Sequence, residues 1–329
     1  MLVPARSLPA SESKLARKAF DKGQGLERDG RYQQALAEYT RALAVSPEPL
    51  RAQILFHRAQ VEIALKAWQP AAGDLAALTQ STPADAEAWK LQGDVLANLA
   101  QPTKAIDSYT RAMSLGLSHA SLFNGLAGQY MALRGYQKAA DNYTRGIRMR
   151  LDDPEPWKAR GMAYMKLGRY RDAIDDFTQS IHLKPDFLDA RVERGFAFGQ
   201  LGEFSRATDD FTEALRADPE NLRAFTLRGA AYAQIGEHAK AAEDFTAAIR
   251  LAPKEEQLYL VRGGSYASLG ENEKALADRE KAVALRPGDP EAYIARGSSF
   301  HEMGRHEEGL ADRTRAIQLA PNLAEAWCA

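Results

Sequence analysis

A 34-residue period runs through the sequence and constrains its fold more than any other feature. Glycine recurs at five positions spaced 34 residues apart, and proline recurs with the same spacing. The glycines are Gly161, Gly195, Gly229, Gly263 and Gly297, and the prolines are Pro185, Pro219, Pro253, Pro287 and Pro321. Two ladders with one period indicate a stack of similar units rather than one globular domain around a single core.

Extended toward the N-terminus, the period divides the chain into nine repeats with two inserted residues, Leu50 and Arg51. Repeats 1 to 9 span 16–49, 52–85, 86–119, 120–153, 154–187, 188–221, 222–255, 256–289 and 290–323. We expect residues 1–15 to form a flexible leader and residues 324–329 to begin a truncated tenth repeat.

Within each repeat the apolar residues follow helical spacing. In repeat 5, Trp157 and Tyr164 share one helical face, and Ala173 and Phe177 begin the stripe of a second amphipathic helix. A turn at Gly168 separates the two stripes, and a proline closes the repeat because it cannot continue a helix. Each repeat is therefore predicted to be a helix–turn–helix hairpin.

This pattern resembles the tetratricopeptide repeat family, whose signature is W-x2-L-G-x2-Y, then A-x3-F, then P. The matching residues in repeat 5 are Trp157, Gly161, Tyr164, Ala173, Phe177 and Pro185. The resemblance covers residues 16–323 and implies an all-α, right-handed α-solenoid of nine repeats. Arg279 and Arg313 replace the expected aromatic residue at position 24 of repeats 8 and 9, and Leu117 and Leu151 replace the proline of repeats 3 and 4. We expect irregular packing in these four repeats.

A basic residue at position 7 of a repeat occurs together with an acidic residue at position 23 of the same repeat, where positions are counted from the first residue of each repeat. Position 7 carries Lys22, Arg58, Arg160, Arg194, Arg228, Arg262 and Arg296, and position 23 carries Glu38, Asp74, Asp176, Asp210, Asp244, Asp278 and Asp312. Repeats 3 and 4 lack both charges, with Gln92 and Ser108 in one and Leu126 and Asn142 in the other. Because the charges occur together or not at all, we predict an ion pair between the two helices of each charged repeat.

The overall composition excludes several classes of protein. Lys and Arg number 43 against 44 Asp and Glu, whereas nucleic-acid-binding proteins are usually strongly basic. The single cysteine, Cys328, excludes disulfides and cysteine-based metal sites within one chain. No apolar run approaches the roughly 20 residues of a membrane helix, and the first residues lack a secretory apolar segment. We expect no nucleic acid, no membrane and a cytoplasmic location.

The motifs of common enzyme classes are missing from the sequence. It has no G-x-S-x-G, H-E-x-x-H, phosphate-binding or dinucleotide-binding motif, and its six histidines are scattered. His301 and His306 are five residues apart and so do not share a helical face. We expect no catalytic residues, no metal and no cofactor, and therefore a non-catalytic scaffold or adaptor. An alternative hypothesis is that the chain is the targeting arm of a larger enzyme, such as a kinase, a transferase or a secretion component, cut at Ala329.

The family resemblance implies that the first helices of the repeats line a concave groove that selects a peptide or helix of a partner. In the family, positions 2, 5, 9, 12 and 13 face this groove. The residues we expect there in repeats 4 to 6 are Asn124, Met131, Lys158, Met162, Met165, Lys166, Val192 and Phe196. This surface is apolar and contains methionines, which adapt their shape to different partners.

Charge along the chain suggests which partner the groove prefers. From Arg134 to Arg171 there are ten basic and four acidic residues, which favours an acidic-hydrophobic peptide. The Lys–Asn carboxylate clamp of chaperone-binding relatives is missing, so we exclude a chaperone tail as the partner. A further hypothesis is self-association through the incomplete C-terminal repeat.

Overall fold

The computed structural model describes residues 10–48 and 50–322, and within these ranges it contains eighteen α-helices and no strand. The helices are α1 (Ala10–Arg28), α2 (Tyr32–Ala44), α3 (Leu50–Ala64), α4 (Trp68–Ser81), α5 (Ala86–Asn98), α6 (Pro102–Ser114), α7 (Ala120–Ala132), α8 (Tyr136–Met149), α9 (Pro154–Lys166), α10 (Tyr170–Leu183), α11 (Leu188–Gln200), α12 (Phe204–Ala217), α13 (Leu222–Gln234), α14 (His238–Leu251), α15 (Glu256–Ser268), α16 (Asn272–Leu285), α17 (Pro290–Glu302) and α18 (His306–Leu319). Two consecutive helices correspond to each predicted repeat, which confirms the all-α solenoid.

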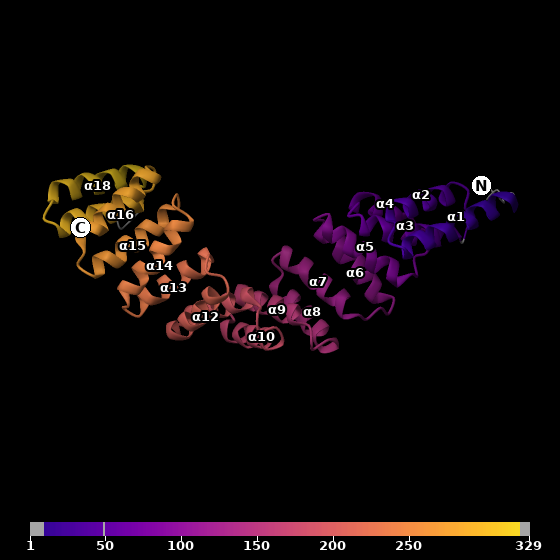
Figure 1. Cartoon of the computed structure of the whole chain (residues 1–329), viewed down its shortest axis with the longest axis horizontal. Helices are drawn as coiled ribbons and strands as arrows, with labels where there is room; N and C mark the ends of the chain where they lie inside the picture. Colours follow the sequence, from indigo (N-terminus) through magenta and orange to yellow (C-terminus); the bar gives the residue numbers. More distant parts are fainter. Residues whose placement is uncertain (1–9, 49, 323–329) are drawn as a thin grey trace. The chain divides into compact units, whose positions relative to one another are not determined.

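The chain divides into two compact units, Met1–Leu167 and Gly168–Ala329. The first unit holds α1 to α9 and the second holds α10 to α18, so the boundary falls between the two helices of repeat 5. Within each unit the helices follow one another in sequence order (Figure 1).

The start of the first helix differs from the sequence-based boundary. Helix α1 begins at Ala10, so residues 10–15 of the expected flexible leader are helical. Ala16 and Phe20 of the same helix are buried, which fixes this helix on the core of repeats 1 and 2. The remaining leader residues 1–9 and the expected tenth repeat at 324–329 lie outside the described residues.

The turn between the two helices of a repeat requires a left-handed backbone. Glycine occupies this turn in six repeats, with φ between 71° and 81°. Repeats 2 to 4 instead place Lys66, Ala100 and Arg134 there, with φ of 57°, 54° and 58°. Residues that carry a Cβ atom are strained in this backbone conformation, so the turns of these three repeats store backbone strain.

The glycine at position 8 allows the two helices of a repeat to approach closely. A Cβ atom added at Gly229 would lie 2.9 Å from Cε1 of Phe245, which is buried at position 24 of the same repeat. Gly195 faces Phe211 in the same way, at 2.8 Å. The repeated glycine therefore makes room for an aromatic ring that fills the space between the helices.

The start of several first helices is fixed by a side-chain cap. Asp85 accepts a hydrogen bond from the backbone N–H of Ala88, and Asn221 does the same for Ala224. Asp153 and Asp289 cap α9 and α17, which both begin with proline. A cap and a proline at the first helical position both favour a helix start at these points.

Helix packing creates two layers within each unit. Inside a unit each helix contacts the next one along the chain, and several neighbouring odd-numbered helices also contact each other, as α5 with α7 and α13 with α15. In these pairs the odd-numbered helices therefore lie side by side on one face of their unit. None of the described helices has the length and apolar character needed to cross a membrane.

Candidate functional site

Ion pairs between positions 7 and 23 join the two helices of a repeat, as predicted. Arg228 donates from Nε and Nη2 to the two carboxylate oxygens of Asp244, at 2.8 and 2.7 Å, and Asp244 is only 5% exposed. The same pairing is present between Lys22 and Glu38, Arg58 and Asp74, Arg194 and Asp210, Arg262 and Asp278, and Arg296 and Asp312. The seventh predicted pair, Arg160 and Asp176, spans the two units and stays a prediction.

Five of the position-7 arginines in the described part of the chain also donate to a threonine of the preceding repeat, a contact that was not predicted from the sequence. Nη1 of Arg228 donates to Oγ1 of Thr212 at 3.0 Å, and Nη1 of Arg262 donates to Thr246 at 2.9 Å. In both cases the threonine lies 16 residues before the arginine and the aspartate 16 residues after it, a symmetry visible in the sequence. Since Arg228 and Arg262 donate on both sides, these arginines are structural residues rather than ligand-binding ones.

Repeats 3 and 4 replace the ion pair with neutral groups. In repeat 3, Ser108 donates a hydrogen bond to Oε1 of Gln92 at 3.1 Å. In repeat 4, Asn142 donates to the backbone oxygen of Lys138, and its buried Oδ1 has no hydrogen-bond partner. Repeat 4 therefore lacks any polar link between positions 7 and 23.

The predicted methionines lie on α7 and α9 and are partly buried. Met131 packs against a cluster that includes Ala127, Tyr143 and Ala163. Met162 and Met165 of α9 are also partly buried, which leaves some of each side chain available to a ligand. The structure thus places these methionines on odd-numbered helices of the first unit.

The polar residues predicted beside the methionines differ in their accessibility. Lys166 is exposed, whereas Lys158 already forms an ion pair with Glu155 at 3.2 Å. Asn124 points toward α8, because a Cβ atom added at Gly146 would clash with its Oδ1. That oxygen is buried without a hydrogen-bond partner, so Asn124 belongs to the helix–helix contact and not to a surface that binds a ligand.

In the second unit, Phe196 lines a hollow of about 120 Å³ formed by α11, α12 and α13. Gly199, Leu227, Ala230 and Gln234 line it as well, and the buried ring of Phe211 also contributes to its wall. Val192, predicted to face the groove beside Phe196, is only 3% exposed and belongs to the core. The hollow is predominantly apolar and lies on the face of consecutive first helices.

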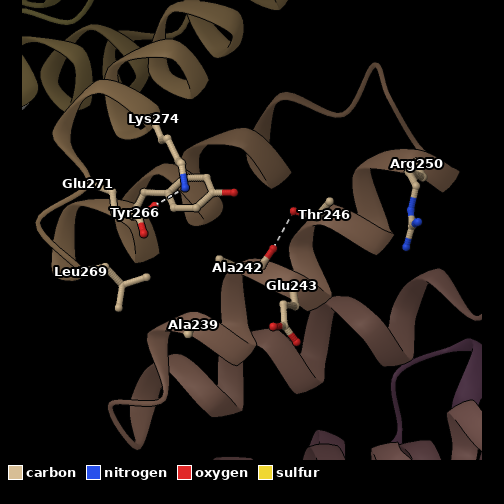
Figure 2. Close-up of a pocket in the computed structure, with 9 residues that line it drawn as sticks. All are labelled: Ala239, Ala242, Glu243, Thr246, Arg250, Tyr266, Leu269, Glu271 and Lys274. Carbon is tan, nitrogen blue, oxygen red and sulfur yellow. Dashed lines mark hydrogen bonds and ion pairs between the residues drawn. The ribbon is translucent and has the colours of Figure 1, made fainter.

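Another hollow lies between successive second helices rather than on the odd-numbered face. Figure 2 shows Thr246 and Arg250 of α14 on one side of it and Tyr266 of α15 on the other, beside the ion pair of Lys274 with Glu271. Its volume is about 360 Å³. A hollow of about 480 Å³ recurs at the equivalent positions of repeats 2 and 3. Because the same hollow recurs at the same positions of different repeats, it results from the way in which successive repeats stack.

A polar cluster in repeats 1 and 2 borders a hollow of about 290 Å³. Glu27 accepts hydrogen bonds from the Tyr39 hydroxyl and from Nδ1 of His57, the latter at 3.0 Å, while Nε2 of His57 accepts from Gln24. Burial and the contact with Glu27 raise the pKa of Tyr39, so its hydroxyl stays a donor. No motif or spacing in the sequence links these four residues, which come from α1, α2 and α3.

Two histidines also contact each other in repeat 9. His301 and His306 meet across the turn between α17 and α18, with their Nδ1 atoms 2.9 Å apart, although they share no helical face. No three His, Cys, Asp or Glu side chains in the described part of the chain are grouped so that they could hold a metal ion.

Sequence models of the tetratricopeptide repeat match the chain at several places. They match residues 20–82, 154–187, 192–256 and 290–323, and the last three ranges coincide with or overlap predicted repeats 5 to 7 and 9. The chain belongs to the tetratricopeptide repeat family. No curated protein matches it in sequence.

Solved structures of other tetratricopeptide repeat proteins share this fold. The C-terminal part of a repeat protein from Cytophaga hutchinsonii is 20% identical, covers 71% of this chain and 96% of its own, and has a TM-score of 0.63. A repeat protein from Parabacteroides merdae is 21% identical, with coverages of 74% and 96% and a TM-score of 0.56. YrrB, described as a tetratricopeptide repeat protein with an unusual peptide-binding site, is 20% identical, with coverages of 57% and 97% and a TM-score of 0.50.

Proposed function

We propose that this tetratricopeptide repeat protein is a cytoplasmic, non-catalytic scaffold that binds an extended or helical peptide segment of a partner protein. The peptide lies along the odd-numbered helices of a single unit. The observation that carries the proposal is the apolar hollow lined by Phe196, Leu227 and Ala230, because a concave apolar surface with a few polar groups is typical of binding sites.

The methionines of the first unit offer a separate apolar surface, on the odd-numbered helices of that unit. Met162 and Met165 are partly buried and flexible, and the exposed Lys166 next to them would attract an acidic residue of the peptide. An acidic-hydrophobic peptide therefore fits this region better than a basic one. The peptide-binding site attributed to YrrB supports the general mode of binding but not a particular sequence.

Selection from a random peptide library on the full chain, followed by affinity measurements on variants, tests the proposal. We expect Phe196→Glu, or Met131→Glu combined with Met162→Glu, to weaken the selected peptides at least tenfold, because a carboxylate in an apolar contact is costly to desolvate. Met149→Glu is the matched control, since Met149 is 48% exposed on α8, a second helix. If the groove variants bind as tightly as the wild type, the peptide does not bind on the odd-numbered helices and the proposal is wrong.

A further inference from the structure

A hollow of about 500 Å³ lies in the first unit, beside the turn between α7 and α8 and the end of α9. Its apolar side chains come from Tyr130, Leu133, Tyr136 and Leu167. Leu133 is 49% exposed and Leu167 is 36% exposed, so both side chains reach solvent. None of the four occupies a repeat position that was predicted to face the groove. The hollow is therefore a surface separate from the one proposed above to bind a peptide.

Two exposed cations, Arg134 and Lys138, line the same hollow. Nζ of Lys138 lies 5.4 Å from the centre of the Tyr130 ring. Neither cation forms an ion pair with a carboxylate in the part of the chain that the structure describes. Helix α7 carries no acidic residue, and the one acidic residue of α8, Asp141, accepts a hydrogen bond from Gln137 at 2.9 Å. The hollow thus joins apolar side chains to two positive charges that a ligand can reach.

The equivalent lysine of repeat 8 makes the same aromatic contact but is already paired with an acid. Nζ of Lys274 lies 5.3 Å from the centre of the Tyr266 ring and 2.7 Å from Oε2 of Glu271 (Figure 2). Repeats 6 and 7 also have glutamate at this position 16, where it pairs with the cation three residues later. Repeat 4 has Gly135 at position 16 instead. Because this carboxylate is missing, Lys138 is available to a ligand, whereas the later repeats neutralise the equivalent cation internally.

Arg134 occupies the turn at a conformational cost. Its φ is 58°, and six other repeats place glycine at this turn position. A residue with a Cβ atom is disfavoured in this left-handed conformation, and such strain is often found where a residue has a function. Since no ion pair within the described part of the chain offsets the strain, a ligand contact explains the arginine better than the structure of the turn does.

We infer that this hollow binds a partner peptide in which a large apolar side chain is flanked by acidic side chains. The apolar side chain packs against Leu133, Tyr136 and Leu167, and the flanking carboxylates accept from Arg134 and Lys138. Charge complementarity selects an acidic peptide over a basic one. This binding surface goes beyond the proposed function, because it lies outside the proposed groove and either site can be wrong without the other.

Fluorescence polarisation with three labelled peptides on the full chain at low salt tests this surface. The peptides are Gly-Glu-Phe-Glu-Gly amide, Gly-Gln-Phe-Gln-Gly amide, which lacks the charges, and Gly-Glu-Ala-Glu-Gly amide, which lacks the aromatic ring. We expect the first peptide to bind more tightly than either of the others by about fivefold or more, since exposed ion pairs and one apolar contact each contribute modestly. No binding of the first peptide, or equal affinity for it and either of the others, would overturn the inference.

Substitution of Gly135 then assigns the charge preference to this hollow. Gly135 has φ of −81° and ψ of 56°, and Glu237 at the equivalent position of repeat 7 has φ of −81° and ψ of 55°, so a side chain fits this backbone. A Cβ atom added at Gly135 would lie 3.4 Å from the Tyr130 ring, an ordinary van der Waals contact. We expect Gly135→Glu to abolish the preference for the Glu-Phe-Glu peptide, because the new carboxylate pairs with Lys138. Gly135→Gln, which has the same shape without the charge, should keep it.

Both Gly135 variants are first shown by circular dichroism to be folded. A preference that survives in Gly135→Glu, or that is lost equally in Gly135→Gln, would contradict the role of charge at this surface.

Arg134→Gly separates binding from stability. Glycine relieves the left-handed strain, so this variant should unfold at a higher denaturant concentration than the wild type. It should nevertheless bind the Glu-Phe-Glu peptide severalfold more weakly, a loss that a purely structural arginine would not cause. If the folded variant binds this peptide as tightly as the wild type, the assignment of Arg134 is wrong.

Phe196→Glu distinguishes this surface from the proposed groove. It should leave binding of the Glu-Phe-Glu peptide unchanged, whereas Gly135→Glu should leave library-selected groove peptides bound. If Phe196→Glu removes Glu-Phe-Glu binding and Gly135→Glu keeps it, the peptide occupies the groove and the hollow is not its site. If the groove variants bind library peptides as tightly as the wild type while Gly135→Glu still removes the Glu-Phe-Glu preference, this surface stands and the proposed groove is wrong.

Discussion

At the scale of single residues, the ion pair between positions 7 and 23 combines two bonds of good geometry with a nearly buried carboxylate. We expect Arg228→Ala and Asp244→Ala each to lower the free energy of unfolding by about 2–4 kcal/mol, because each leaves a partly buried charge without its partner. The double variant should lose about 1–3 kcal/mol less than the sum of the two.

Chemical denaturation of the four proteins in this cycle measures the coupling. The exposed pair of Arg216 and Glu213 on α12 provides the control, since its side chains are 71% and 48% exposed. There the coupling should stay below about 0.5 kcal/mol. If the losses of unfolding free energy at Arg228 and Asp244 are additive, the ion pair between them contributes no coupling energy.

Glycine at position 8 illustrates a second effect at this scale, in which packing outweighs helix propensity. An exposed glycine inside a helix costs about 1 kcal/mol relative to alanine, so Gly73→Ala on α4 should stabilise the protein by about that amount. We expect Gly229→Ala to destabilise it by about 1–3 kcal/mol instead, because the new methyl group would clash with the ring of Phe245. Thermal unfolding of both variants gives the comparison, and a stabilised Gly229→Ala would rule out the close-approach explanation.

At the scale of the helices and their turns, repeats 2 to 4 adopt a left-handed turn without glycine. Ala100 adopts φ of 54° in a turn where six other repeats place glycine. We expect Ala100→Gly to raise the free energy of unfolding by about 1 kcal/mol, because the left-handed backbone no longer carries a Cβ penalty. Gly202→Ala, the reverse change in the equivalent turn of repeat 6, should lower it by a similar amount.

Denaturant titrations of both turn variants check this prediction. The slope of the unfolding transition should stay unchanged, since neither substitution alters the buried area. A loss of stability in Ala100→Gly would mean that unfolded-chain entropy outweighs the relief of strain.

The helices of this fold can be predicted from the sequence because every repeat carries the same pattern of residues. Gly161 and its four successors predict the helix pairs, and the joint loss of charge at Gln92 and Ser108 predicts which helices the ion pairs join. The period fixes the position of a residue within its repeat. It does not fix how far a given helix is rotated about its axis.

Two residues that were predicted to face the groove lie in the interior of the helix pairs instead. Val192 and Asn124 occupy the same position of their repeats as Lys158, yet both turn inward while the lysine reaches solvent. For Asn124 the cause is local, because Gly146 leaves a space on α8 that the amide fills. The burial of Arg279 could not be predicted either. A charged residue at a position that is usually aromatic suggests disrupted packing, whereas the structure buries this cation between the helices.

At the scale of the whole molecule, a repeat array has many local interfaces in place of a single core. Helices contact only near neighbours in the described part of the chain, so a change in one repeat should spread only to adjacent repeats. Glu62 on α3 offers a way to test this locality with pH. Its side chain is 5% exposed, one carboxylate oxygen has no hydrogen-bond partner, and burial together with the charge of Asp74 raises its pKa to about 7.

The direction of the pH effect follows from this raised pKa. The folded protein holds the Glu62 proton more tightly than the unfolded chain, whose carboxyl group has its ordinary pKa near 4.5. The stabilisation is complete below about pH 4.5 and is lost as the pH rises through about 7, by about 3 kcal/mol at most. Glu62→Gln cannot ionise, so it should be more stable than the wild type at pH 8 and similar to it at pH 5.

Hydrogen exchange followed by mass spectrometry shows where along the array this difference appears. At pH 8 we expect Glu62→Gln to slow hydrogen exchange in α3, which carries Glu62, and in α1, α2 and α4, which contact α3. Exchange in α17 should be unchanged. At pH 5 the two proteins should exchange alike throughout. Because the comparison is made at one pH at a time, intrinsic exchange rates cancel between wild type and variant. Equal slowing in α3 and α17 would instead mean that the two units unfold in a single cooperative step, and nearest-neighbour stability would then be the wrong description of this array.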